Sequence, residues 1–139
     1  MKKNGAGADV NSPAVLGVLS DLFFGVKIAD AATRAGGRML FVKSEEQFMS
    51  LAAKAPALVV FDLHERSLDA MDLLRKLKAD VALAEIPTLA FFSHVQEELR
   101  RAALALGCDA VLPRSVFTER VEDLVGGAVR RALASPPRQ

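Results

Sequence analysis

The segment Pro56-Ala-Leu-Val-Val-Phe-Asp-Leu63 decides the fold of this chain. It is a run of aliphatic and β-branched residues that ends at one carboxylate, Asp62. A strand that is apolar on both faces belongs in a parallel sheet with helices on either side. Open sheets of this kind carry their functional groups at the carboxyl ends of the strands. The sequence therefore predicts that Asp62 lies in a functional site.

Three further apolar runs end in polar residues. They are Ala14–Leu19, followed by Ser20 and Asp21; Pro87–Phe92, followed by Ser93 and His94; and Asp109–Leu112, followed by Pro113 and Arg114. Parallel strands end at the same edge of a sheet. We therefore expect a carboxylate, a hydroxyl and a guanidinium to lie near Asp62.

This set of strand ends resembles the receiver domain of bacterial two-component response regulators. That family has an acidic pair after its first strand, a phosphoacceptor aspartate after its third, Ser or Thr after its fourth and Lys-Pro after its fifth. The resemblance runs from about Ala14 to Leu133, and Leu68-Asp69-Ala70 stands where receivers usually have Met-Asp-Gly. It implies a flavodoxin-like α/β fold, a doubly wound five-stranded parallel sheet of order 2-1-3-4-5 with five helices.

Length and composition fit one soluble domain. The chain has 139 residues, of which 51% are hydrophobic and 25% are charged, values typical of a soluble globular protein with one core. The formal charge of +1 gives no electrostatic case for nucleic acid or a membrane surface as a partner. A single cysteine, Cys108, excludes an intramolecular disulfide, and no apolar run reaches membrane-spanning length. We expect a cytoplasmic protein.

One receiver-like domain is predicted over residues 14–133, between disordered tails at 1–13 and 134–139. No sequence for an output domain remains, which predicts a single-domain protein. The first helix is expected to end at Gly36-Gly37, and Ser44 with Gln47 forms a capping box for the second. The third helix is predicted at about 68–78. The fifth helix is predicted to carry its apolar face at Val121, Leu124, Val125 and Ala128.

The resemblance also implies a chemistry for the site. In receivers a divalent cation joins the acidic pair, the phosphoacceptor and a backbone carbonyl two residues later. The corresponding ligands here are Asp21, Asp62 and the carbonyl of His64, and Mg²⁺ prefers such oxygen ligands. Asp62 would attack an acyl phosphate or phosphohistidine donor. Ser93 and Arg114 would each hold an oxygen of the phosphoryl group, so these two residues and Asp62 are the candidate catalytic residues.

Two positions at the site depart from the family pattern. Ser20 stands at the first acidic position, which removes one carboxylate and should make Mg²⁺ binding weak. Arg114 replaces the lysine, and a planar guanidinium is not equivalent to a compact ammonium. Arg114 could bind Asp62 directly and imitate the charge of a metal or a phosphate. The Lys-Pro bond of the family is absent, and Leu112-Pro113 is the candidate for a cis peptide bond, although trans is the usual form.

Two further departures affect signalling. Val111 occupies a position where receivers often have a Tyr or Phe that rotates on activation, and valine has no polar group and a stiff side chain. His94 follows Ser93 at a position that is small in most receivers, where an imidazole could shield Asp62 from a kinase. These changes favour an atypical receiver, a candidate pseudo-receiver.

Such a protein would act through protein–protein contacts and would not be an enzyme. The partner surface implied by the family comprises the fourth helix, fifth strand and fifth helix, near residues 97–101, 109–112 and 119–130. A second copy of the chain could bind there and form a homodimer. The alternative is a phosphorelay receiver that a histidine kinase phosphorylates on Asp62 with Mg²⁺.

Simpler interpretations stay open for the same residues. Asp62 could be only a turn former, and Asp21 could cap the first helix, act as a ligand, or do both. Arg114 could make a structural ion pair with Asp62. A minor alternative is transition-metal binding or pH sensing by His64 and His94, the only histidines in the chain. Flavin binding is set aside, because no Gly/Ser/Thr-rich phosphate loop follows the first strand and the chain has no Trp or Tyr.

Overall fold

The computed structural model describes residues 11–93 and 97–135. Strands and helices alternate along this part of the chain. The predicted tails, 1–13 and 134–139, lie largely outside the described residues. The disorder of the tails and the domain boundaries at 14 and 133 therefore stay predictions.

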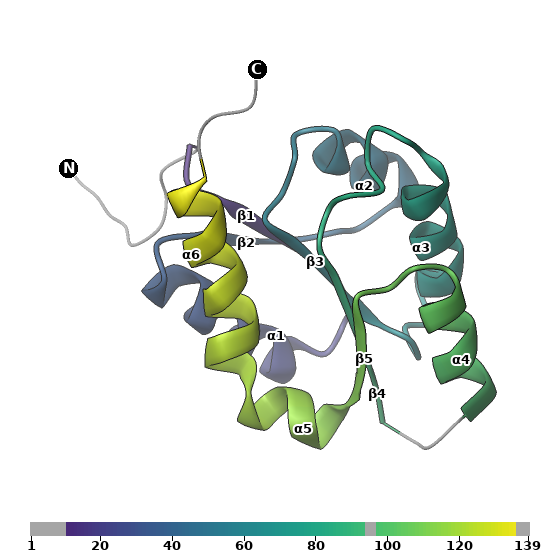
Figure 1. Ribbon diagram of the computed structural model, residues 1–139. Coiled ribbons are helices and arrows are strands. Elements are labelled where there is room, and N and C mark those ends of the chain that lie inside the picture. The colour runs from purple at the N-terminus through teal and green to yellow at the C-terminus, as the bar shows by residue number, and fades with distance from the viewer. Residues whose placement is uncertain (1–10, 94–96, 136–139) are drawn as a thin grey trace.

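Five strands form one parallel sheet in the order β2-β1-β3-β4-β5 (Figure 1), which confirms the predicted topology. They are β1 (Ala14–Val18), β2 (Arg38–Phe41), β3 (Leu58–Asp62), β4 (Thr88–Phe92) and β5 (Ala110–Pro113). In β3, Leu58 and Val60 face one core cluster, whereas Val59 and Phe61 face the other. None of these four side chains is more than 2% exposed. The unbroken apolar run thus places β3 at the centre of the sheet.

Helices cover both faces of the sheet (Figure 1). On one face lie α1 (Leu22–Arg34), α5 (Arg114–Glu119) and α6 (Gly127–Ala134); on the other lie α2 (Glu45–Ala52), α3 (Ala70–Ala79) and α4 (Glu97–Ala105). The first group packs around Phe24, Ile28 and Phe117. The second packs through its own apolar side chains, among them Phe48 of α2 and Leu74 of α3. Each helix therefore buries one apolar stripe against the sheet.

The prediction of five helices is wrong by one for the residues that the structure describes, which form six α-helices. The predicted fifth helix corresponds to a π-helical segment η1 (Glu122–Gly126) followed by α6, and α5 is an additional helix that precedes it. Arg120 closes α5 with φ −109° and ψ 15°, outside the helical region. The chain is helical again from Val121, and η1 continues into α6 through Gly126 and Gly127, which both have helical backbone angles.

Helix ends follow the predicted signals with two differences. Gly36, with φ of +100°, ends α1 in a Schellman motif in which Gly37 N–H donates to Ala32 O at 2.8 Å. Ser44 Oγ accepts from Gln47 N–H at 3.0 Å, but Gln47 returns its bond to the N–H of the preceding Lys43. The third helix begins at residue 70 rather than 68, because the residue before it, an aspartate, caps it.

The Leu112-Pro113 peptide bond is trans, so the cis candidate is wrong. No helix among the described residues is long and apolar enough to cross a membrane.

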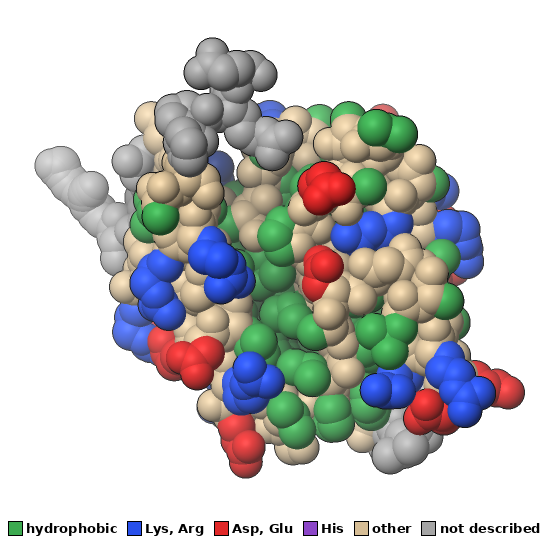
Figure 2. Space-filling view, viewed as in Figure 1, with side chains coloured by type: hydrophobic (Ala, Val, Ile, Leu, Met, Phe, Trp, Pro, Cys, Tyr) green, Lys and Arg blue, Asp and Glu red, His purple; other side chains and the backbone are tan. Residues whose placement is uncertain are grey.

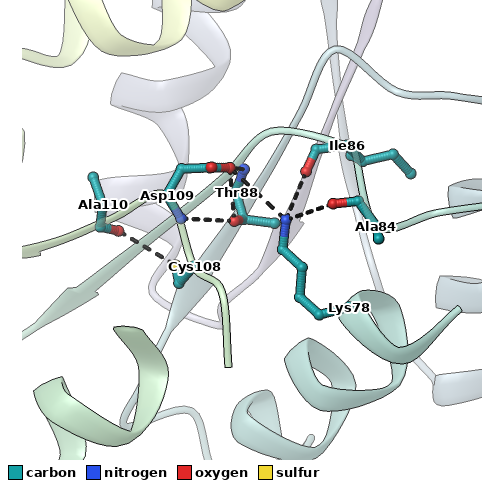
Figure 3. Close-up of polar contacts among 7 residues, drawn as sticks. All are labelled: Lys78, Ala84, Ile86, Thr88, Cys108, Asp109 and Ala110. Carbon is teal, nitrogen blue, oxygen red and sulfur yellow. Dashed lines mark hydrogen bonds and ion pairs between the residues drawn. The ribbon is translucent and has the colours of Figure 1, made fainter. Parts of the chain in front are cut away.

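A partly buried polar network closes the opposite, amino edge of the sheet (Figure 3). Lys78 Nζ donates to Ala84 O at 2.9 Å and to Ile86 O at 3.2 Å. Asp109 Oδ2 lies 3.9 Å from the same nitrogen and accepts from Thr88 N–H and Oγ1 at 2.8 and 3.1 Å. The network ties α3 to the starts of β4 and β5 at the edge remote from the predicted site.

Candidate functional site

The predicted site residues follow strands that are neighbours in the sheet. β1, β3, β4 and β5 lie side by side and run parallel. Asp62 ends β3, while Asp21, Ser93 and Arg114 follow the ends of β1, β4 and β5. The fold therefore brings all four residues to one edge, as expected from the order of strands.

Asp62 is half-buried at this edge. Its Oδ1 accepts a hydrogen bond of 2.9 Å from the backbone N–H of His64. Burial raises the pKa of the Asp62 carboxyl, and the nearby charge of Glu65 acts in the same direction, whereas the His64 N–H opposes them. The Asp62 carboxylate is consequently a stronger base than an exposed aspartate.

Arg114 bonds to Asp21 and not to Asp62, contrary to the expected clamp on Asp62. Its Nη2 donates to Asp21 Oδ2, and its guanidinium carbon lies 4.4 Å from the centre of the Phe24 ring. Asp21 is held toward that ring because it caps α1, accepting from Phe24 N–H at 3.0 Å through Oδ1. The Phe24 N–H first, and then Arg114, lower the pKa of Asp21.

Position 20 has no carboxylate of its own, but the carboxylate of Glu65 lies beside it. Ser20 Oγ donates to Glu65 Oε2 at 2.6 Å, and Ser67 donates to the same oxygen through its N–H at 3.1 Å and through its hydroxyl. Burial alone would raise the pKa of Glu65, but these hydrogen bonds outweigh it and lower the pKa. Glu65 was not among the predicted site residues. The sequence feature that could have indicated Glu65 is its place in the loop after Asp62, in a chain where Ser20 stands at the first acidic position of the family pattern.

Ser93 is exposed and shares a shallow pocket with Arg114. The pocket has a volume of about 550 Å³ and is lined by Phe92, Ser93, Pro113, Arg114, Ser115 and Thr118. Ser93, Ser115 and Arg114 therefore bring two hydroxyls and a guanidinium to one space, whereas the Thr118 hydroxyl donates to Arg114 O at 2.8 Å. Groups of these types donate hydrogen bonds to anionic oxygens.

Several solved structures share this architecture. The signal receiver domain of a signal transduction histidine kinase from Syntrophus aciditrophicus matches with a TM-score of 0.72 at 15% identity, over 92% of this chain and 98% of that one. The phosphorylated cyanobacterial phytochrome response regulator RcpA matches with 0.69 at 16% identity, over 91% and 97%. The Mn²⁺-bound form of response regulator Rcp1 matches with 0.69 at 15% identity, over 91% and 99%.

The chain has the receiver-domain fold. No family model matches the sequence, and no curated protein matches it. At these identities the structural likeness identifies the receiver fold, and function has to be argued from the residues of the site.

The residues that would hold a divalent cation in a receiver do not fit one as they stand. Ser20 supplies no carboxylate, and both oxygens of Asp21 are engaged, one by Phe24 N–H and the other by Arg114. Within 11–93 and 97–135, no three His, Cys, Asp or Glu side chains are grouped so that they could hold a metal ion. The predicted set of Asp21, Asp62 and the His64 carbonyl therefore stays a prediction that this arrangement does not favour.

Two further predictions for the receiver site concern Val111 and His94. The side chain of Val111 is buried at 6% exposure, as suits a packing residue on β5. His94 lies outside the described residues, so its shielding of Asp62 and the two-histidine hypothesis with His64 stay predictions.

Proposed function

We propose that this chain is an atypical receiver-type signalling module in which Asp62 accepts a phosphoryl group and protein–protein contacts carry the response. One observation supports it above the others: Arg114 bonds to Asp21, which leaves Asp62 with only the His64 N–H as a hydrogen-bond donor in the described part of the chain. A carboxylate can act as a nucleophile when one of its oxygens is not held by a cation. The arrangement of Asp62 meets that condition.

The donor would be a phosphohistidine of a histidine kinase, or an acyl phosphate. An oxygen of Asp62 would attack phosphorus, the bond from phosphorus to the donor atom would break, and the donor would leave with its electron pair. Ser93 and Arg114 would hold oxygens of the transferred group. The similar structures that are named for a histidine kinase and for a phosphorylated regulator support this choice of donor. The module would have no other enzymatic activity and would work in the cytoplasm.

The partner surface would comprise α4, β5 and the α5–η1 segment. Its half-buried apolar residues are Leu99, Leu106, Ala110, Leu112, Val121 and Leu124. Figure 2 shows apolar side chains gathered in the middle of this face, with Lys, Arg, Asp and Glu around them. An apolar centre inside a charged rim suits a protein partner or a second copy of the chain. It does not suit a nucleic acid or a membrane surface.

Intact mass after incubation with acetyl phosphate tests the proposal, with Asp62→Asn as the control. We expect an added phosphoryl mass that Asp62→Asn abolishes. Beryllofluoride should shift amide signals near Asp62, Ser93 and Val111 in two-dimensional spectra. If neither modification nor shift occurs, with or without Mg²⁺, Asp62 is not an acceptor. The pseudo-receiver interpretation, with contacts that need no phosphorylation, would then replace this one.

A further inference from the structure

Asp21 has no oxygen left without a hydrogen-bond donor. Oδ1 accepts from Phe24 N–H at 3.0 Å, and this bond caps the first turn of α1. Oδ2 accepts from Arg114 Nη2. A cation that took Asp21 as a ligand would share this carboxylate with the Arg114 guanidinium, and the two positive charges would repel each other. Position 20 offers a hydroxyl and no second carboxylate.

The packing around Arg114 holds its guanidinium at Asp21. The guanidinium carbon lies 4.4 Å from the ring centre of Phe24 and 5.9 Å from that of Phe91. These rings are themselves fixed, 4.7 Å apart edge to face. The Arg114 carbonyl accepts from Thr118 Oγ1 at 2.8 Å, and 33% of the Arg114 side chain is exposed. Contact with aromatic faces stabilises a guanidinium in this place.

We propose that Arg114 takes the place of the divalent cation at this site, so that phosphorylation of Asp62 does not depend on a metal. Only the second part of this inference, that phosphorylation of Asp62 does not depend on a metal, rests on the proposed function. The guanidinium balances the charge of Asp21 through Nη2, and the other N–H groups of its planar fork can face an incoming phosphoryl group. Lysine could not do both, because its charge is a single point.

Charge at the site supports this substitution. A second carboxylate, Glu65, lies at the same edge but accepts three hydrogen bonds from Ser20 and Ser67. These hydrogen bonds hold the Oε2 atom of Glu65 at the two serines. Two anionic groups of the edge, Asp21 and Glu65, therefore have partners from the chain itself, and a bound divalent cation would compete with those partners.

Binding of Mn²⁺ tests the first half without any phosphorylation. Free Mn²⁺ is measured by electron paramagnetic resonance in titrations of the wild type, Arg114→Lys, Arg114→Ala and the matched surface control Arg120→Lys. We expect both Arg114 variants to bind Mn²⁺ roughly five-fold more tightly than the wild type, because the guanidinium that competes for Asp21 in a partly exposed ion pair is gone. Arg120→Lys should not differ, and adding Asp21→Asn should remove the gain. Equal Mn²⁺ affinity in the wild type and both Arg114 variants would overturn the inference.

Labelling of Asp62 by acetyl phosphate tests the second half. The wild-type rate should be the same in EDTA and in Mg²⁺, whereas Arg114→Lys should be labelled in Mg²⁺ and not in EDTA. Loss of wild-type labelling in EDTA would overturn the inference while leaving Asp62 as the acceptor. If Asp62 is labelled in neither condition, the proposed function fails. The Mn²⁺ titration then decides alone whether Arg114 occupies the cation position.

Discussion

The ammonium group of Lys78 connects α3 to the loop that leads into β4, at the edge of the sheet remote from Asp62 (Figure 3). It donates to the carbonyls of Ala84 and Ile86 at 2.9 and 3.2 Å. Only 12% of its side chain is exposed, and Asp109 lies 3.9 Å away. The perturbation we consider is Lys78→Met, which keeps the length and packing of the hydrocarbon chain but removes the charge and all three donors.

The expected loss follows from these contacts. A hydrogen bond from a charged donor contributes about 1.5–3 kcal/mol, and a buried carbonyl left without a donor costs about 1–3 kcal/mol. Water can reach part of the surface loop that contains Ala84 and Ile86, which offsets some of this cost. We therefore expect Lys78→Met to lower the free energy of unfolding by about 2–4 kcal/mol. In a domain of this size the melting temperature would fall by roughly 10 °C.

Urea unfolding followed by far-ultraviolet circular dichroism measures the effect, and Lys76→Met is the matched control. Lys76 lies on the same helix but is 42% exposed, and it pairs with Glu45 and Asp72 at the surface. Exposed ion pairs contribute little, so Lys76→Met should leave the unfolding midpoint nearly unchanged. Equal losses in both variants, or a loss below about 1 kcal/mol for Lys78→Met, would refute the argument that buried hydrogen bonds of Lys78 stabilise this edge.

Three further expectations concern stability and the site. Burial raises the pKa of Asp62, so the ionised carboxylate destabilises the native state. Asp62→Asn should therefore raise the melting temperature at pH 7. The gain should vanish below pH 3.8, the ordinary pKa of aspartate, where the carboxyl is protonated in both the folded and the unfolded state. Glu65→Gln should lower the pKa of Asp62, seen by carboxyl ¹³C titration, whereas the exposed Glu85→Gln should not. An ideal Cβ at Gly37 would lie 2.8 Å from Pro13 O, so Gly37→Ala should destabilise by about 1–3 kcal/mol in urea unfolding.

The strands were predictable because their signal is local. An apolar run that covers both faces of a strand, as in 58–62, fits no other position than the middle of a covered parallel sheet. The break between α5 and α6 was not predictable in the same way. The apolar spacing of residues 121–128 suits one helix, whereas the break lies before them at Arg120, whose φ of −109° and ψ of 15° are not indicated by the spacing of apolar residues.

Placement of the site residues at one edge followed from strand order, but the pairing among them did not. The choice of Arg114 between Asp21 and Asp62 is decided by the Phe24 ring, which lies beneath the guanidinium. That ring lies there because α1 buries Phe24 to 2% exposure against β4 and α5. Such a contact joins three elements far apart in the sequence, so no local pattern predicts it.

The serine at position 20 and the placement of Glu65 depend on each other. Glu65 Oε2 lies 2.6 Å from Ser20 Oγ, a place that a second carboxylate could share only at the cost of strong repulsion between like charges. An acidic residue at position 20 would therefore repel Glu65 in its present placement. The carboxylate beside Ser20 comes from the loop after β3 and not from the end of β1. Ser20 lacks the carboxylate that the family pattern has at this position, but Glu65 provides a negative charge at the same edge. The missing carboxylate at Ser20 and the arginine that holds Asp21 are thus the two features of this edge that do not favour the predicted cation site.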